Sequence, residues 1–273
     1  MKLNKLQILS TVRGEILVPN YFDYETNYKI YSAVASVTLS KSVDTFLKEF
    51  PIDKEIKKEQ TSTEQITTEI QFQLDAIYAK HKKINYSEDN IRTFGVHTSL
   101  SRLKHSYEVC IFLINLGFYF EANTIIRLIF EQLVFCTNIA DVTNEEYAKL
   151  KPGDLSLSST KIGKLENIVS DIEIGKFYGD LSNRAHININ EVGKYLEYDD
   201  EIKQVMIVER SQNLTLVSAI LLLTVSYIHQ IVLEYSFKEF ITEFEHLERI
   251  NGGYKSIPNI EFRKKIDMYH NLV

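Results

Sequence analysis

The chain has 273 residues, which is enough to bury a sizeable core in one large domain or two small ones. Hydrophobic residues make up 44% and charged residues 25% of it, a globular balance that excludes a mainly disordered chain. The net charge of −6 excludes broad, non-specific binding of nucleic acid, which needs a strongly basic surface, but it leaves room for a local basic site.

The two cysteines and the N-terminal sequence bear on the compartment of the protein. Cys110 and Cys136 form neither a metal-type pair nor a disulfide framework, so we expect buried, reduced thiols. The N-terminal sequence MKLNKLQILSTVRGE lacks the long apolar run of a secretory signal. Together they predict a cytoplasmic location.

Residues that break regular structure are sparse. No proline occurs between Pro51 and Pro152 or between Pro152 and Pro258, and the whole chain has 10 glycines. Because proline and glycine are the main helix breakers, long uninterrupted helices are expected. Alternating strand patterns are scarce. The sequence therefore predicts an all-α fold, a multi-helix bundle.

We divide the chain into an N-terminal segment (1–60), a main helical bundle (61–250) and a short C-terminal helix (251–273). The first segment is predicted to have an irregular or short-strand start and then a helix from about residue 28 to residue 50, where Pro51 stops it. The apolar face of that helix is expected to carry Ile30, Val34, Val37, Phe46 and Leu47.

Two polar sequences come next. The balanced charge run DKEIKKEQ at 53–60 predicts a solvated connection. Thr61-Ser62-Thr63-Glu64 resembles a capping box, so it is expected to open the next helix. The apolar positions of that helix are Ile66, Ile70, Leu74 and Ile77.

The middle third predicts the central element of the bundle. Helices are expected at about 91–116 and 119–140, separated only by a break at Gly117. A connection this short requires the two helices to fold back as a long antiparallel hairpin. Further helices are expected near 159–172 and 173–186.

The last third predicts an irregular connection at 188–200 and a long helix from about 201 to 234. The following FKEFITEFEHLERI offers an extension of that helix, which Asn251-Gly252-Gly253 would end. Within the helix, residues 214–233 are long and apolar enough to cross a bilayer. However, His229 and Gln230 interrupt this apolar run, and no lysine or arginine cluster flanks it. We therefore predict an interior helix and no membrane.

The second helix of the hairpin carries one narrow polar stripe on an otherwise apolar surface. Thr124, Arg127, Glu131 and Asn138 fall at steps of three, four and seven residues. Arg127 and Glu131 are one turn apart and can pair. The stripe is either the wet face of the helix or a polar seam that faces other helices. In a buried seam each charge would need a partner.

Hydrogen-bonding residues also line one side of the predicted helix at 173–186. Tyr178, Ser182 and His186 stack at four-residue steps. A histidine can act as a general acid or base near neutral pH, and Arg184 could stabilise a phosphate. A histidine at a helix end that is satisfied by a carbonyl group is the structural alternative.

Motifs of several large enzyme classes are absent from the sequence. It has no HExxH or CxxC, P-loop, Rossmann glycine pattern or GxSxG elbow. His105 and Glu108 share a helix face and form either a metal half-site or a solvated pair. No metal and no cofactor is therefore expected, and the missing motifs argue against dinucleotide-binding, P-loop NTPase and α/β-hydrolase functions.

The order of two motifs resembles a group of bacterial helical proteins. Arg-x-x-x-Glu, from Arg127 to Glu131, is followed by Tyr-x-x-Leu-Ser-x-x-x-His, from Tyr178 to His186. This group is distantly similar to HEPN proteins, helical domains often found as ribonucleases in toxin–antitoxin and phage-defence systems. In those nucleases an arginine and a histidine four to six residues apart cut RNA across a dimer interface. Here Arg184 and His186 are only two apart, so on a helix they would point about 200° apart.

The resemblance implies a bacterial defence or stress-response protein on a HEPN-like bundle, acting as a metal-independent ribonuclease if it is an enzyme. His186 would be the acid or base, Arg127 or Arg184 the phosphate stabiliser, and Glu131 and Ser182 their orienting groups. RNA, a second copy of the chain and a partner protein from the same system are the implied partners. The alternative is a non-catalytic protein–protein interaction module in which these residues form a structural network. In either case we predict that Arg127, Glu131 and His186 converge in the bundle interior or in a cleft.

Overall fold

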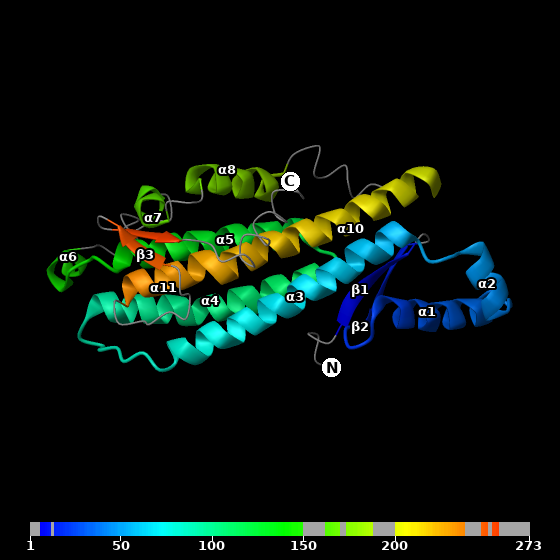
Figure 1. The fold of residues 1–273 in the computed structure, drawn as a ribbon, viewed down its shortest axis with the longest axis horizontal. Coiled ribbons are helices and arrows are strands. Elements are labelled where there is room, and N and C mark those ends of the chain that lie inside the picture. The colour runs from blue at the N-terminus through cyan, green and yellow to red at the C-terminus, as the bar shows by residue number, and fades with distance from the viewer. Residues whose placement is uncertain are drawn as a thin grey trace.

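The computed structural model describes residues 6–11, 14–149, 162–169, 173–187, 200–237, 247–250 and 253–256. The described chain is mostly α-helical (Figure 1). Its elements, in chain order, are β1 (Leu6–Thr11), β2 (Gly14–Pro19), α1 (Tyr24–Thr38), α2 (Val43–Glu49), α3 (Lys54–His81), α4 (Ile91–Asn115), α5 (Tyr119–Ile139), α6 (Asn144–Ala148), α7 (Gly163–Ile168), α8 (Ile174–Ala185), α10 (Asp200–Leu223), the π-helical turn η3 (Thr224–His229), α11 (Gln230–Ser236), β3 (Leu247–Ile250) and β4 (Gly253–Ser256).

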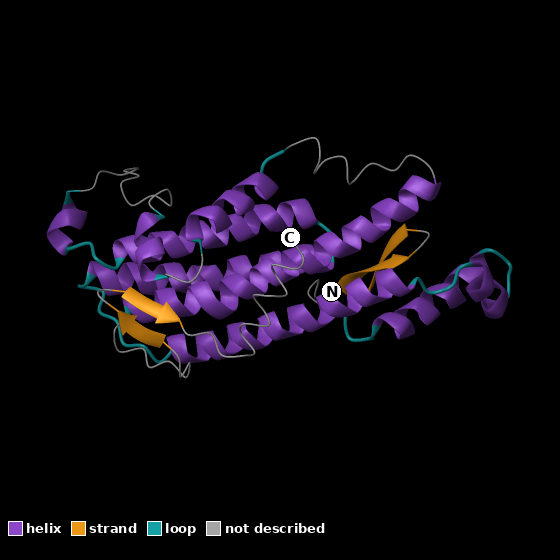
Figure 2. Cartoon of the chain, turned by 45° about the horizontal axis from the view of Figure 1, so that its top comes forward, coloured by secondary structure: helices purple, strands orange, loops and turns teal. Residues whose placement is uncertain are grey.

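Four long helices form an elongated bundle (Figures 1 and 2). α3 packs along α10, α4 packs along α5, and the shorter α8 lies on the outer side of α5. Apolar side chains at helical spacing bury the surfaces between them. The fully buried members of this core include Ile70, Leu100, Leu103, Ile126, Phe130, Val217 and Ile220. The predicted helical bundle is therefore confirmed at the level of a mostly α-helical fold.

The antiparallel hairpin of α4 and α5 is also confirmed, with ends within one residue of those predicted. The side chain of Asn90 caps α4 by accepting hydrogen bonds from the backbone amides of Arg92 and Thr93. Gly117 makes the turn with a φ of 77°. This positive φ favours glycine, and a Cβ atom there would also lie 2.7 Å from Ile8 Cδ1, so that side chain would have to shift.

The predicted connection at 53–60 is wrong, because these residues form the first turns of α3. Asp53 caps that helix by accepting from the amides of Glu55 and Ile56. Ile56 and Gln60 are buried at a four-residue step. The charged residues between them cover the outer face, so the charge run belongs to an amphipathic helix. The boundary drawn at residue 61 consequently falls inside α3.

The predicted helix at 28–50 is two helices. Its predicted apolar face is wrong for Ile30, Val34 and Val37 but confirmed for Phe46 and Leu47, which pack inward. The left-handed backbone of Ser40, with a φ of 53°, ends α1. Tyr24 and Tyr28 of α1 point inward. The hydroxyl of Tyr24 donates to the carbonyl of Ser10 at 2.9 Å, and that of Tyr28 donates to the carbonyl of Phe50 at 3.1 Å. These aromatic anchors determine the rotation of the helix. The inward residues are Tyr24, Asn27, Tyr28, Ser32 and Ser36, whereas Ile30, Val34 and Val37 are exposed.

The all-α prediction needs a correction, because two antiparallel hairpins occur among the described residues. In β1 alternate side chains point to opposite faces: Ile8 joins the main core and Leu9 joins a second small cluster with Tyr24 and Tyr28. β3 and β4 pair Ile250 with Gly253. β3 replaces the end of the predicted helix extension, and β4 replaces the start of the predicted C-terminal helix. As a sequence, Asn-Gly favours a hairpin over the end of a helix. Residues 238–246, 251–252 and 257–273 lie outside the described residues.

The long helix predicted at 201–234 is present as α10, η3 and α11. Among the described residues one helical segment, Ile207–Ser236, is long and apolar enough to cross a membrane, and its most apolar part is entirely buried within the protein. This packing agrees with the interior helix that its polar residues predict. The π-helical turn places His229 in the core, where it is fully buried.

Candidate functional site

The aromatic ring of Phe130 fixes the position of α8 on α5. The ring of Tyr178 stacks on that of Phe130, with centroids 5.6 Å apart and planes at 25°, and Phe177 meets it edge-on, also at 5.6 Å. Leu181, one turn further along α8, is buried in the core. Such aromatic pairs contribute about 0.5–1.5 kcal/mol beyond their buried area. The packing brings the hydroxyl of Tyr178 to the polar stripe of α5.

Three side chains of this seam form a closed set of hydrogen bonds. Arg127 Nε donates to Glu131 Oε1 at 3.0 Å, and the hydroxyl of Tyr178 donates to the same oxygen at 3.1 Å. Arg127 Nη2 donates to the Tyr178 hydroxyl at 3.4 Å. Burial alone would lower the pKa of Arg127, but the hydrogen bonds that it donates to Tyr178 and Glu131 and the charge of Glu131 outweigh burial and raise that pKa. The guanidinium is therefore fixed in position and stays charged.

His186 reaches this set from beyond the end of α8. Its backbone is extended, with φ −87° and ψ 139°, and its amide donates to the carbonyl of Ser182. The predicted helical stack of Tyr178, Ser182 and His186 is wrong for His186, because the helix ends at Ala185. The extended backbone instead places His186 Nε2 3.4 Å from Arg127 Nη1.

The predicted convergence of Arg127, Glu131 and His186 is confirmed, but the three do not lie in the bundle interior, which was one of the two predicted places. The side chains of Arg127 and Glu131 are 27% and 22% exposed, and His186 is exposed. The seam lies at the surface between α5 and α8 because α8 covers only one flank of α5 (Figure 1). We call Arg127, Glu131, Tyr178 and His186 the α5–α8 cluster. Its most exposed member is His186.

The remaining predicted site residues do not join this cluster. In the part of the chain that the structure describes, no hydrogen bond or ion pair links the Ser182 hydroxyl or the Arg184 guanidinium to Arg127, Glu131 or His186. Ser182 contributes only its backbone carbonyl. Tyr178, which the sequence placed in a polar line but not in the site, makes two of the hydrogen bonds. The sequence did contain a signal for this role. Tyr178 lies four residues before Ser182, on the same helix face, so it could face the Arg-x-x-x-Glu motif of α5.

The candidate metal half-site is a solvated pair. His105 Nδ1 lies 3.4 Å from Glu108 Oε2, and Lys104 Nζ lies 3.8 Å from the other carboxylate oxygen. The His105 side chain is 80% exposed. Across the described ranges, no group of three histidine, cysteine or acidic side chains is arranged to hold a metal ion. A pair of this kind contributes little to stability or binding.

Sequence reasoning missed a second polar group, which lies inside the bundle. His229 is fully buried, stacked on Tyr107 with ring centroids 5.6 Å apart, and its two ring nitrogens have no hydrogen-bond partner among the described residues. Burial lowers the pKa of His229 to about 3. It also lowers the pKa of His81 on α3 to about 4, and His97 on α4 adds to that lowering. We call His81, His97, Tyr107 and His229 the interior histidine cluster.

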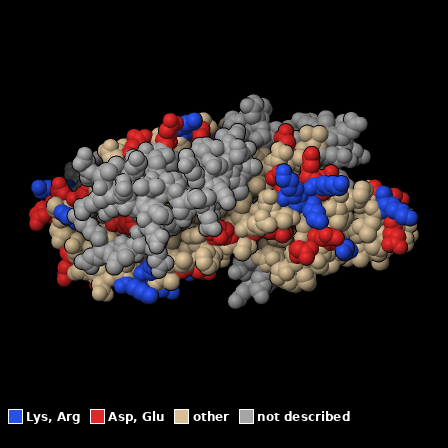
Figure 3. Space-filling model, viewed as in Figure 1, with Lys and Arg blue, Asp and Glu red and all other residues tan. Residues whose placement is uncertain are grey.

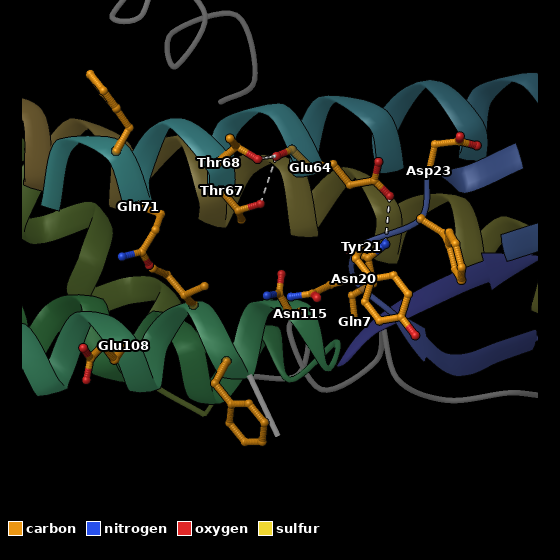
Figure 4. A pocket seen from close by; sticks show the side chains of 14 residues that line it. Gln7, Asn20, Tyr21, Asp23, Glu64, Thr67, Thr68, Gln71, Glu108 and Asn115 are labelled. Atoms are coloured by element: carbon orange, nitrogen blue, oxygen red, sulfur yellow. Dashed lines mark hydrogen bonds between the residues drawn. The ribbon is translucent and has the colours of Figure 1, made fainter. Parts of the chain in front are cut away.

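A groove of about 920 Å³ opens between α3 and α4, on a different part of the bundle (Figure 4). Gln7 of β1 closes one end and donates to Glu64 Oε1 at 2.9 Å. Burial raises the pKa of Glu64, and that hydrogen bond partly offsets the rise. The groove is lined by amides, acids, hydroxyls and aromatic rings, and by no lysine or arginine. Its lining is Gln7, Asn20, Tyr21, Phe22, Asp23, Glu64, Thr67, Thr68, Gln71, Phe72, Glu108, Ile111, Phe112 and Asn115.

Comparisons of the chain with protein-family models, with curated proteins and with solved structures found no match.

Proposed function

We propose that the α5–α8 cluster is a metal-independent phosphodiester-cleaving site and that the protein is an RNA-cleaving effector of a bacterial defence or stress response on a HEPN-like bundle. The observation that supports the chemistry is the contact between Arg127 and His186, 59 residues apart in sequence. The biological setting is supported by the motif resemblance alone.

In the proposed reaction, RNA displaces the contact between Arg127 Nη1 and His186 Nε2, and that nitrogen takes the proton of an RNA 2′-hydroxyl. The freed oxygen bonds to the adjacent phosphorus while the bond from phosphorus to the 5′-oxygen breaks. The 5′-oxygen takes a proton from water, so the products are a 2′,3′-cyclic phosphate and a free 5′-hydroxyl. The known contacts of Arg127 use three of its five N–H donors, so at least two can bind the phosphate oxygens where negative charge develops. Glu131 and Tyr178 hold the guanidinium from the other side. An imidazole beside a fixed guanidinium supplies both functions without a metal.

The alternative is a non-catalytic module for protein–protein interaction. Two observations favour it. First, the polar groups of Arg127, Glu131 and Tyr178 hydrogen-bond to one another, as expected of a structural network. Second, the α3–α4 groove offers a separate binding surface. Its aromatic rings include Tyr21 and Phe72, each 67% exposed. Carboxylates and exposed rings suit a basic peptide, through ion pairs and cation–π contacts.

An RNA degradation assay separates the two functions. Purified wild-type protein is incubated with labelled single-stranded and structured RNAs in EDTA, beside His186→Ala and Arg127→Ala. Matched controls are His105→Ala and Arg102→Ala, which remove an exposed histidine and an exposed arginine of α4. We expect cleavage by the wild type and both controls, and loss of roughly 100-fold or more in the two cluster variants.

Thermal unfolding of every variant completes the comparison. Lost cleavage in a variant that melts at the wild-type temperature supports the enzyme, because the fold is then intact. Tyr178→Phe gives a further readout, since it keeps the ring packed on Phe130 but removes the hydroxyl that holds Arg127. Absence of cleavage of every RNA by the wild type, with lower melting temperatures in both cluster variants, would contradict the enzyme and favour the interaction module.

A further inference from the structure

Two carboxylates, those of Asp23 and Glu64, lie at the end of the α3–α4 groove that Gln7 closes (Figure 4). Asp23 accepts hydrogen bonds from the backbone amide and the hydroxyl of Thr26, at 2.8 and 3.1 Å. Glu64 accepts one from the side-chain amide of Gln7, which is buried. These donors are all neutral. Among the described residues, no lysine or arginine forms an ion pair with either carboxylate.

The negative charge of Glu64 is unfavourable in the protein without a ligand. Glu64 is partly buried, and burial raises its pKa, to which the charge of Asp23 adds. Asp23 itself stays ionised, because its hydrogen bonds from Thr26 lower its pKa. An opposite charge within about 4–6 Å stabilises an ionised carboxylate in such surroundings. This end of the groove is therefore suited to an ammonium or guanidinium group that a ligand supplies.

Aromatic rings in the lining of the groove are a second feature that attracts cations. The rings of Tyr21 and Phe22 have their centroids 4.6 Å apart, with planes at 54°. Tyr21 and Phe72 are each 67% exposed, and Phe22 is 39% exposed. A lysine or arginine side chain within about 6 Å of such a ring is attracted to its face. The groove thus presents rings and carboxylates together, and no lysine or arginine lines it.

The size of the groove and its amides favour a peptide over a single small amine. Its volume of about 920 Å³ is near the upper end of the roughly 300–1,000 Å³ found for pockets that hold whole drug-sized ligands. Glu64 and Phe72 are two turns apart on α3, so this side extends for about 12 Å. Four residues of an extended chain span about 13 Å. Side-chain amides, which can donate to and accept from a peptide backbone, come from Asn20, Gln71 and Asn115.

We propose that the α3–α4 groove binds an extended basic segment of a partner protein, with one lysine or arginine side chain paired to Glu64. The segment runs along α3 toward Phe72, and the rings of Tyr21 and Phe72 pack on its side chains. The proposal deepens the interaction-module alternative by naming the chemistry of its partner. It does not depend on RNA cleavage, because the groove and the α5–α8 cluster lie on different helices.

Fluorescence anisotropy with the labelled peptide ARARARA tests the proposal, beside the acidic control peptide AEAEAEA. Acidic side chains occur over much of the face in Figure 3, so general attraction of a basic peptide has to be separated from binding in the groove. Glu64→Gln is therefore compared with Glu145→Gln, and Phe72→Ala with Tyr147→Ala, at exposed positions of α6. We expect a wild-type dissociation constant on the order of tens of micromolar. It should weaken about tenfold in Glu64→Gln and about threefold in Phe72→Ala, and change less than about twofold in both controls.

Thermal unfolding without peptide separates a binding role of Glu64 from a structural one. Glu64→Gln keeps an oxygen that can accept from Gln7 but removes the charge, so it should melt at or above the wild-type temperature. If it melts lower, Phe72→Ala decides, because that ring is exposed and its loss leaves the fold intact. Binding that is unchanged in Phe72→Ala, or in a stable Glu64→Gln, would overturn the proposal. So would a wild type that binds neither peptide or both equally, and displacement of the peptide by an equal concentration of spermidine. The assay contains no RNA, so its outcome is independent of the cleavage assay.

Discussion

Replacing His229 by phenylalanine should stabilise the protein at neutral pH. The imidazole is fully buried and stacked on Tyr107, with Tyr78 edge-on to it at 5.5 Å. A phenyl ring keeps this packing and removes two buried nitrogen atoms that lack hydrogen-bond partners among the described residues. Burying one unsatisfied polar group costs about 1–3 kcal/mol. Because phenylalanine is slightly larger and adds some strain, we expect a net gain of about 1–2 kcal/mol in the free energy of unfolding.

The same variant should flatten the loss of stability in acid. In the folded protein the pKa of His229 is lowered from 6.5 to about 3 and that of His81 to about 4. Between the unfolded pKa of 6.5 and the folded pKa values of about 3 and 4, the unfolded chain binds more protons than the folded chain. The free energy of unfolding therefore has its full value above pH 6.5 and decreases as the pH falls. At pH 5 each histidine contributes a loss of about 2 kcal/mol. The wild type should therefore lose about 4 kcal/mol from these two residues, and His229→Phe about half of that.

Urea unfolding followed by circular dichroism at pH 7 and pH 5 measures both effects. Glu234 titrates in the same window, since burial raises its pKa to about 8, but its contribution is the same in both proteins and cancels in the difference. His105→Phe, at an exposed position, controls for the loss of a histidine as such. A His229→Phe variant that is less stable by more than about 2 kcal/mol at pH 7 would refute the reasoning, because the ring nitrogens would then be hydrogen-bonded to water or a ligand.

Three other measurements follow from the structure. Glu131→Ala should cost about 1–2 kcal/mol of unfolding free energy, because a half-buried carboxylate loses two hydrogen bonds, and Lys29→Ala, in an exposed ion pair, should cost under about 1 kcal/mol. Equal costs in urea titrations would show that the two hydrogen bonds to Glu131 contribute no more than an exposed ion pair. Gly117→Ala should lower the free energy of unfolding by about 1–3 kcal/mol, because of the positive φ at this position and the contact with Ile8. The control Gly179→Ala should be neutral or stabilising, because nothing lies within 4 Å of its Cβ position. A neutral Gly117→Ala would contradict the strained turn. In cell fractionation the protein should remain in the supernatant without detergent, because the apolar part of Ile207–Ser236 is buried. Recovery in the membrane pellet, with release only by detergent, would refute the interior-helix prediction.

Local signals in the sequence were sufficient for the α4–α5 hairpin and for the Arg127 and His186 convergence. The hairpin depends on apolar periodicity and on one glycine, Gly117, that permits only a short turn. The convergence was predicted from two polar lines at helical spacing, of which the line on α5 is correct, whereas His186 reaches Arg127 through extended backbone beyond the end of α8. Both arguments need only residues that lie close together in sequence. The depth of burial was not predictable in this way, because it depends on how much of α5 the shorter α8 covers.

Features that depend on distant contacts could not be read from the sequence. α1 looked like a helix with Ile30, Val34 and Val37 inside, yet the hydroxyl of Tyr24 binds the carbonyl of Ser10 on β1 and sets the opposite rotation. A periodic pattern indicates an apolar face but not whether a partner surface exists for it. The interior histidine cluster escaped notice for a similar reason, since its members come from separate helices and have no common spacing.

The pairing of α3 with α10 has a consequence for synthesis of the chain. A hydrogen bond between Thr63 Oγ1 and Thr215 Oγ1, at 3.0 Å, joins two buried residues 152 positions apart. At about 5–20 residues per second, the ribosome needs roughly ten to thirty seconds to make the stretch between them. α4 and α5 can fold together in that interval because their contacts are local. The apolar face of α3 must wait, so nascent chains that stall before α10 should be the species that chaperones hold and that aggregate most readily.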